Sequence, residues 1–308
     1  MSLDTLLDRL VVPGYTKLGY ALRSRTWPVD DPEPQALQGK TVIVTGARSG
    51  LGKATAAALA TLGATVRLAV RDPSNATTAL ADLQSTGGTF ILDQCDIADL
   101  TSVRAYAATV EEPIHALIHN AGVMPPTRTE SPQGHELTLA THVLGPLLLT
   151  ELLKDHLARA IFVASGGMYT QPLPRDPEYR DSPYKPAVAY ARSKRIQVDL
   201  TPLMATHFAP VTIATMHPGW SDTPGLTTSL PGFARLTGPL LRTPEQGADT
   251  AVWLAATEPP PPTGNFWHDR RIRPTHYLDR TRSTLTETTW TYCLEQAGVP
   301  QPPPSSTT

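Results

Sequence analysis

The sequence predicts an α/β fold in which a doubly wound parallel sheet lies between two layers of helices. Short β-branched runs alternate with helix-like stretches over most of the chain. Such alternation implies right-handed crossovers and parallel strand pairing. The runs alternate little between apolar and polar residues, which is typical of strands that are buried on both faces. We therefore expect a three-layer αβα architecture in a single domain, with helical extensions at both ends.

The same pattern places the individual strands and helices. We expect six strands, at residues 41–45, 65–70, 89–95, 115–120, 160–165 and 211–216. Between them we expect helices near residues 50–62, 75–85, 99–111, 132–157 and 187–206. Gly63 follows the first helix at the position where a glycine commonly ends a helix. Thr243, Pro244 and Gln246 predict the start of a later helix with a capping box.

Proline-rich segments divide the chain into three parts. Residues 1–39 are expected to form an N-terminal helical extension and a linker, and residues 40–270 the main domain. Residues 271–308 are expected to form a C-terminal extension with one helix and a disordered tail. The two extensions therefore flank one large α/β unit.

Both extensions carry helix signals. Leucines at helical spacing near the N-terminus predict an amphipathic helix: Leu3, Leu6, Leu7 and Leu10. We expect this helix to pack on its own domain, and a membrane-surface or partner-binding helix is the alternative. Near the C-terminus, Thr284 and Glu287 form a predicted capping box, and Gly298 is expected to end that helix.

Composition excludes several classes of function. The 308 residues include 26 lysines and arginines against 28 acidic residues, so a net charge of -2 gives no reason to expect nucleic acid as a partner. No apolar run is long enough for a transmembrane segment. Cys95 and Cys293 form no ligand cluster, and the histidines show no ligand spacing, so we expect no metal site. These features favour a cytoplasmic protein.

A glycine-rich stretch, TVIVTGARSGLGKATAAALA (residues 41–60), joins the first predicted strand to the first predicted helix. Gly46, Gly50 and Gly52 allow a tight turn and a close approach to the backbone. The N-terminus of the helix offers unpaired N–H groups and the positive end of its dipole, which suit a pyrophosphate. The alternative is a glycine turn that serves packing alone, which the strand–loop–helix context disfavours.

The spacing Thr45-Gly46-x-x-x-Gly50-x-Gly52 resembles the TGxxxGxG loop of the short-chain dehydrogenase/reductase (SDR) family. Further family motifs follow in the family's order over roughly residues 40–270: CDIAD, HNAG, VAS, YARSK and HPGWSDT. Other segments, such as SGGM, LPGFAR and TGNFWHDR, resemble one subgroup of the family. The resemblance implies a Rossmann-type NAD(P)-binding domain and an oxidoreductase that transfers hydride.

Four residues are the candidates for catalysis: Ser165, Tyr190, Lys194 and His142. Tyr190 and Lys194 lie four positions apart, so on a helix they share one face. We expect the lysine ammonium to lower the pKa of the phenol. The resemblance implies that Tyr190 exchanges a proton with the substrate oxygen, that Ser165 orients that oxygen, and that Lys194 meets the nicotinamide ribose. The alternative is a core tyrosine beside a solvated lysine.

His142 stands where the family usually carries an asparagine. The resemblance implies that this asparagine holds a water that links the lysine to solvent. Histidine also hydrogen-bonds water, but its size and its titration near pH 6.5 differ. We consider three readings in this order: His142 substitutes in the proton relay, the relay is weakened, or the chain only binds the cofactor.

NADP(H) is the expected cofactor. Many family members carry an aspartate for the 2′-hydroxyl of NAD where this chain has Val70. Arg71 follows it, and Arg48 lies in the glycine loop, so two guanidiniums are available for a 2′-phosphate. Solvated surface arginines are the alternative, since Asp72 could pair with either. The resemblance implies that the cofactor also meets Thr45, Ser49, Leu51, Asp96, Ile97, Asn120, Ala121, Gly122, Pro218, Gly219 and Thr223, besides the loop glycines, Tyr190 and Lys194.

The substrate side is predicted from two segments that interrupt the strand–helix pattern. A proline-broken loop lies between Ser165 and Tyr190. After Pro218, large apolar residues are interleaved with glycine and proline: Trp220, Leu226, Leu230, Phe233, Leu236 and Leu240. These suit an apolar lid over a small apolar carbonyl or alcohol, and a core or interface segment is the alternative.

The sequence therefore predicts an NADPH-dependent oxidoreductase. The alternative is a catalytically weak NADP-binding protein with a regulatory or assembly role. Hydrolysis through Ser165 is disfavoured because no GxSxG elbow surrounds it. A homodimer is a further expectation, because helices that bear the catalytic motifs often pair subunits in the family. The alternative is that the added N-terminal segment blocks or rearranges that contact.

Overall fold

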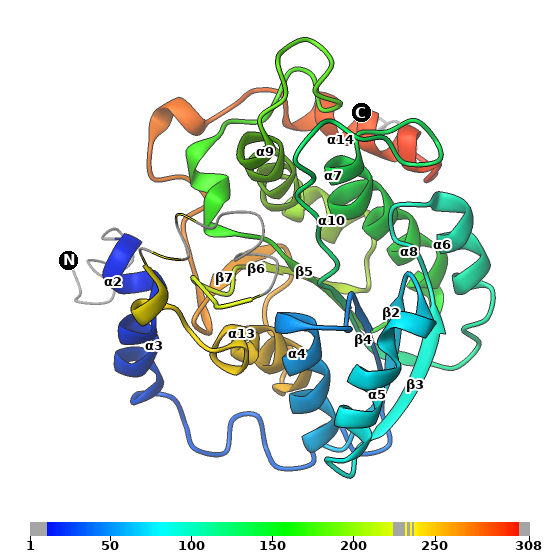
Figure 1. The fold of residues 1–308 in the computed structure, drawn as a ribbon, viewed down its shortest axis with the longest axis vertical. Helices are drawn as coiled ribbons and strands as arrows, with labels where there is room; N and C mark the ends of the chain where they lie inside the picture. Colours follow the sequence, from blue (N-terminus) through cyan, green and yellow to red (C-terminus); the bar gives the residue numbers. More distant parts are fainter. Residues whose placement is uncertain (1–10, 224–231, 233–234, 236, 302–308) are drawn as a thin grey trace, which may run out of the picture.

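In the computed structural model an eight-stranded sheet forms the centre of the molecule, with helices on both faces (Figure 1). The structure describes residues 11–223, 232, 235 and 237–301. The strand order is β3-β2-β1-β4-β5-β6-β7-β8. The strands are β1 Thr41–Thr45, β2 Thr65–Val70, β3 Thr89–Gln94, β4 Ile114–His119, β5 Arg159–Val163, β6 Thr212–Met216, β7 Asn265–His268 and β8 Arg271–Ile272. Only the pairing of β7 with β8 is antiparallel.

The predicted fold class and the six predicted strands are confirmed, but two strands were missed. β7 pairs with β6 in parallel, and β8 returns antiparallel to β7. Both are very short, and their pairing depends on residues far away along the chain, so local β-branched content gave no signal. The sheet consequently extends past residue 270, where we expected the main domain to end.

Two helical layers enclose the sheet (Figure 1). One apolar core lies under α4 (Gly50–Thr61), α5 (Thr77–Gln84) and α13 (Pro244–Ala256). The opposite core is covered by α6 Leu100–Ala107, α8 Gly145–Leu153, α9 Pro186–Asp199, α10 Thr201–His207 and α14 Thr286–Ala297. The first strand contributes to both cores, because Val42 and Val44 face one layer and Ile43 the other. Neighbouring positions of a strand point to opposite faces, and burial on both faces explains the continuous apolar runs.

The predicted helix at 132–157 is wrong at its start and in its regularity. A short helix, α7 (Leu137–Leu139), begins only after Glu136, whose carboxylate accepts a hydrogen bond from the backbone N–H of Leu139 (2.8 Å). A π-helical turn at Ala140–Leu144 follows and leads into α8. Pro146 lacks the N–H that a regular α-helix needs at that point, and a π-turn is one way to accommodate such an interruption.

The cap predictions had mixed outcomes. Gly63 has a φ of +93°, as expected for the residue that ends α4. The capping box of Thr243 and Gln246 is present at the start of α13. The box expected of Thr284 and Glu287 is wrong, because α14 begins at Thr286 without a side-chain cap. Gly298 ends α14 in the left-handed conformation, as predicted.

Both extensions pack on the main body within the described residues. In the N-terminal extension, α2 (Val11–Tyr15) and α3 (Lys17–Ser24) lie beside the segment that leads into α13 (Figure 1). The four leucines of the predicted amphipathic helix fall in residues 1–10, outside the described part. In the C-terminal extension, α14 buries Cys293 and Leu294 in the core that α8 shares.

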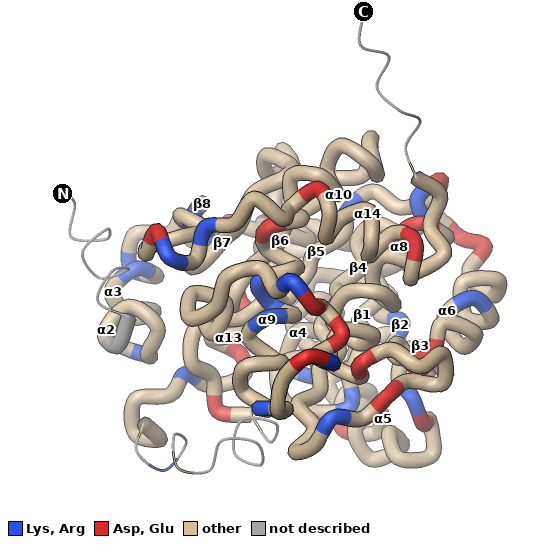
Figure 2. Tube along the Cα trace, turned by 90° about the horizontal axis from the view of Figure 1, so that it is seen from above, with Lys and Arg blue, Asp and Glu red and all other residues tan. Residues whose placement is uncertain are grey.

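Charged positions of both signs are interspersed along the described chain in the view of Figure 2. That view contains no continuous band of one sign, which agrees with the nearly balanced composition. Among the described residues one helical stretch, Leu137–His156, is long and apolar enough to cross a membrane, but 78% of its apolar 18-residue window is buried inside the protein. Such burial is typical of a core helix.

Candidate active site

The carboxyl ends of the central parallel strands open into a cleft of about 980 Å³. The strand order reverses between β1 and β4, and ligands of open α/β sheets bind at such a point. Most of the predicted site residues line this cleft: Gly46, Arg48, Ser49, Gly50, Leu51, Gly52, Arg71, Asp96, Ile97, Asn120, Ala121, Gly122, Ser165, Tyr190, Lys194, Pro218, Gly219 and Thr223. Thr45 and His142 are buried behind its wall. The structure thus brings together residues spread over 178 positions of the chain, from Gly46 to Thr223.

The floor of the cleft is a pair of loops tied together by Thr45. Its hydroxyl accepts hydrogen bonds from the backbone N–H groups of Asn120 and Ala121, both at 3.0 Å. The Asn120 side-chain amide donates back to the Thr45 carbonyl (3.0 Å). The loop after β1 and the loop after β4 are therefore joined by protein hydrogen bonds alone.

The loop glycines are required by close contacts. A Cβ at Gly46, whose φ is +67°, would lie 2.8 Å from the Ala121 Cα, and a Cβ at Gly52 would lie 2.4 Å from the Asn120 side-chain nitrogen. The Ser49 side chain makes no capping hydrogen bond to the first turn of α4. The N-terminus of α4 thus faces the cleft with backbone donors that this side chain does not occupy, which suits a diphosphate.

At the other side of the glycine loop, two exposed arginines line the cleft. Neither Arg48 nor Arg71 forms a salt bridge with any residue in the described part of the chain. The carboxylate of Asp72 instead accepts hydrogen bonds from Ser74 and Asn75. Both guanidiniums remain available to an anionic ligand.

Tyr190 and Lys194 lie on one face of α9, as predicted, with the lysine Nζ 5.7 Å from the centre of the tyrosine ring. The ammonium donates to the Val163 carbonyl at the end of β5 (2.7 Å). Burial lowers the pKa of Lys194 to about 7. Burial raises the pKa of Tyr190, and hydrogen bonding with Ser165 opposes this shift. The expected lowering of the Tyr190 pKa by Lys194 is therefore absent, because the ammonium is directed at a backbone carbonyl.

His142 is fully buried and stands edge-on to the Tyr190 ring, with the ring centres 5.3 Å apart. Its Nε2 accepts a hydrogen bond from the Val123 N–H (3.0 Å), so the proton of the neutral ring lies on Nδ1. Nδ1 donates to the Ser193 hydroxyl (2.7 Å), which in turn donates to the Tyr190 carbonyl (2.8 Å). Burial, with a smaller effect of Lys194, lowers the pKa of His142 well below its ordinary value. Both ring nitrogens are thus engaged by the protein.

A family model for short-chain dehydrogenases matches residues 40–231. The chain belongs to the short-chain dehydrogenase/reductase family. An SDR relative, "Dehydrogenase/reductase SDR family member 12" of Bos taurus, is 40% identical over 286 residues, covering 89% of this chain and 90% of the bovine protein. This confirms the subgroup indicated by the sequence. Retinol dehydrogenase 14 of Mus musculus is 33% identical over 253 residues, covering 73% of this chain and 76% of the mouse protein.

A crystal structure of an uncharacterized protein from Mycobacterium paratuberculosis has a similar fold, with a TM-score of 0.70 and 27% sequence identity. It covers 87% of this chain and 96% of its own. Membership of the SDR family makes this chain an oxidoreductase of a family that uses nicotinamide cofactors. The glycine loop, the paired arginines and the Tyr190–Lys194 pair fit such a cofactor.

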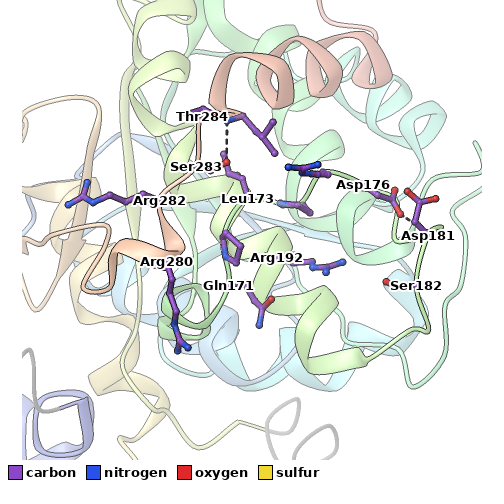
Figure 3. Close-up of a pocket in the computed structure, with 14 residues that line it drawn as sticks. Gln171, Leu173, Asp176, Asp181, Ser182, Arg192, Arg280, Arg282, Ser283 and Thr284 are labelled. Carbon is purple, nitrogen blue, oxygen red and sulfur yellow. Dashed lines mark hydrogen bonds between the residues drawn. The ribbon is translucent and has the colours of Figure 1, made fainter.

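A second cavity, of about 840 Å³, lies between the loop after η4 (Gly166–Thr170) and the start of the C-terminal extension (Figure 3). Its lining includes Arg192, Arg280 and Arg282. Figure 3 shows these three side chains pointing in different directions, so they do not form a convergent anion site. Among the described residues of this SDR no group of histidine, cysteine and acidic side chains is suited to hold a metal ion.

Sequence reasoning missed several residues at the end of the cleft that Pro218 and Trp220 line. Tyr15 and Arg242 are buried against the segment that begins at Pro218, and Asp269 joins them. The hydrogen-bond partners of Arg242 and Asp269 lie up to 246 positions away, so no local spacing could reveal them. Of the predicted apolar lid, Trp220 lines the cleft and Leu240 is 42% exposed, while Leu226, Leu230, Phe233 and Leu236 lie outside the described residues.

Proposed function

We propose that the protein is an NADPH-dependent oxidoreductase that interconverts a carbonyl and an alcohol on an apolar small molecule, with Tyr190 as the acid/base. The observation that carries this proposal is the shared cleft. Ser165, Tyr190 and Lys194 lie in the same cleft as the glycine loop that opens α4. A bound nicotinamide cofactor would supply or accept the hydride.

Tyr190 transfers a proton, and Ser165 orients the substrate. In the reducing direction Tyr190 gives the proton of its phenolic oxygen to the substrate oxygen, and in the oxidising direction it takes that proton back. The Ser165 hydroxyl orients the substrate oxygen and stabilises developing negative charge there. Because burial raises the pKa of Tyr190, the phenol is protonated in this structure and can donate its proton.

The pair of arginines supports NADPH over NADH. A 2′-phosphate would accept charge-assisted hydrogen bonds from Arg48 and Arg71, which have no acidic partner among the described residues. At the end of β2 the buried Val70 occupies the place where NAD-specific relatives need a carboxylate. A 2′-hydroxyl would leave both guanidiniums without an anion.

An apolar substrate is supported by the lining near the catalytic residues. Val123, Met124 and Trp220 line the cleft together with Tyr190. The similarity to retinol dehydrogenase 14, whose name indicates an apolar alcohol, agrees with this class of substrate. The predictions of a cytoplasmic location and of a homodimer stay part of the proposal.

His142 enters the proposal as a positioning residue and not as a proton relay. Its contacts join Val123, which lines the cleft, to the helix that carries Tyr190. A ring nitrogen that already accepts from a backbone N–H cannot take a proton without losing that bond. The second candidate, a catalytically weak NADP-binding protein, is favoured by a different observation: His142 replaces the amide side chain that usually binds the water in this family.

Single-turnover hydride transfer with a panel of apolar ketones and aldehydes separates the two candidates. We expect NADPH oxidation by the wild-type protein, and a loss of roughly 100-fold or more in Tyr190→Phe, as is typical for removal of a general acid. Tyr184→Phe is the control, because its hydroxyl contacts Glu136 and lies outside the cleft lining. Tight NADPH binding without hydride transfer to any member of the panel would favour the weak binder. Normal transfer by folded Tyr190→Phe would remove Tyr190 from the mechanism.

A further inference from the structure

The N-terminal arm, defined here as residues 13–25, contacts the loops at the nicotinamide end of the cleft although about 200 positions separate them in the chain. Figure 1 shows α2 and α3 beside the yellow segment that leads into α13. A separate appendage would touch only the outside of the domain. This arm instead contributes buried side chains and backbone carbonyls.

Tyr15 is the centre of these contacts, with only 1% of its surface exposed. Its ring packs edge-on against His217 at 4.5 Å between ring centres, and against Trp220 at 6.3 Å. A Cβ at Gly166, the residue after Ser165, would lie 2.8 Å from the Tyr15 ring. One aromatic ring therefore touches both the segment that follows Ser165 and the segment around Trp220.

The backbone of the arm fixes the segment Pro218–Thr223 as well. The Tyr15 carbonyl accepts a hydrogen bond from the Trp220 N–H (2.8 Å). Gly219 has a φ of +76°, and a Cβ there would lie 2.7 Å from the Tyr15 carbonyl oxygen. The path of the chain at Gly219 is thus shaped around the arm.

A buried ion cluster holds the arm in place. Arg242 donates two hydrogen bonds to the Asp269 carboxylate, at 2.6 and 2.8 Å, and Arg23 donates a third at 2.7 Å. Both arginines also donate to the Gly14 carbonyl at 3.0 Å. Arg242 reaches the Pro218 carbonyl too, at 3.3 Å. Because the three charged side chains are at most 6% exposed, each needs a partner of opposite charge, and Arg23 of the arm completes the cluster around Asp269.

We propose that the N-terminal arm positions the nicotinamide end of the active site, with Tyr15 as the positioning residue that sets Trp220 and the segment after Ser165. The inference rests on the proposed function, because that function assigns Pro218–Thr223 to the nicotinamide and Ser165 to the substrate oxygen. Among the described residues the arm makes no backbone hydrogen bond to Gly46–Gly52 or Arg71, which serve the opposite end. Damage to the arm should therefore affect one half of the dinucleotide site and spare the other.

The test compares Tyr15→Ala with Leu18→Ala, a control on the exposed face of α3 where the side chain is 53% exposed. Three measurements are made on the 308-residue chain: the kinetics of ketone reduction (kcat and KM), the change in NADPH fluorescence on binding, and the affinity for 2′,5′-ADP. The last ligand carries the adenosine half without nicotinamide. A misplacement of about 1 Å at a reacting centre can cost about 100-fold in rate.

We expect Tyr15→Ala to lower kcat by roughly 10- to 100-fold and to diminish the nicotinamide fluorescence change, while the affinity for 2′,5′-ADP stays within about twofold of wild type. Leu18→Ala should match wild type in all three measurements. Tyr15→Phe keeps the aromatic ring and should retain most of the wild-type kcat. Should Tyr15→Ala not fold, Tyr15→Leu keeps much of the apolar volume and is judged by the same criteria.

Unchanged kcat and fluorescence in a folded Tyr15 variant would overturn the inference. So would an equal loss of 2′,5′-ADP affinity, since that result would mean a general loss of structure. The fluorescence comparison remains informative if the wild type binds NADPH without turning over any ketone. In that case the proposed function fails, while the effect of Tyr15 on the nicotinamide is still measured.

Discussion

Replacing Arg48 and Arg71, the two arginines beside the glycine loop, should change the choice of cofactor. Arg48 and Arg71 are exposed, so solvent screens their attraction to a 2′-phosphate and each contributes about 1–2 kcal/mol rather than the larger value of a buried pair. We therefore expect Arg48→Ala and Arg71→Ala each to weaken NADPH binding by roughly 5- to 30-fold. Binding of NADH should stay within about twofold of wild type, because its 2′-hydroxyl carries no charge.

The double variant tests whether the two guanidiniums share one phosphate. Groups that contact a common partner are not additive, so the loss in the double variant should differ from the product of the single losses. Fluorescence titration with NADPH and NADH at two salt concentrations measures all the affinities, and the preference for NADPH should shrink at high salt. Lys53→Ala is the control. Lys53 lies on α4, the helix that the glycine loop opens, and its ammonium pairs with Asp82 of α5 at 2.6 Å. Equal affinity of the wild type for both cofactors, or equal losses for both in the arginine variants, would refute the reasoning.

Two further predictions concern packing and pH. A Cβ at Gly145 would lie 1.9 Å from the Ile97 carbonyl oxygen, so Gly145→Ala should lower the free energy of unfolding by about 1–3 kcal/mol or more. Urea denaturation checks this against Gly238→Ala, where no atom lies within 4 Å of the added carbon, and equal stability of the two variants would contradict it. Burial lowers the pKa of Lys194 from 10.5 to about 7, so between these values the unfolded chain binds a proton that the folded protein does not, and the contribution of Lys194 to stability increases as the pH rises. Lys194→Met should flatten that dependence in urea titrations across the window, and an unchanged slope would contradict the assigned shift.

The parts of the molecule that local patterns define were predictable. The residues of the glycine loop lie close together in the sequence, and Tyr190 and Lys194 are related by helical spacing. Both motifs can therefore be recognised from the sequence. The strands of the central sheet are buried on both faces and appear as apolar runs. The regular cap of α13 likewise depends on Thr243 and Gln246 alone.

The parts that were missed depend on contacts between distant residues. β7 has four residues, and only its pairing with β6 and β8 makes it a strand. The ionic contacts of Asp269 with Arg23 and Arg242 join positions 246 and 27 residues apart. The direction of the Lys194 side chain was also unpredictable, since this helical residue donates to a backbone carbonyl at the end of β5. A side-chain pattern carries no information about such backbone partners.

The link that Thr45 makes between the two floor loops has a thermodynamic consequence for ligand binding. Its hydrogen bonds to Asn120 and Ala121 are made within the protein, so these backbone segments lose their conformational freedom when the chain folds. A dinucleotide that binds the folded protein would not have to order these loops, so its binding free energy would include no entropic cost for ordering them.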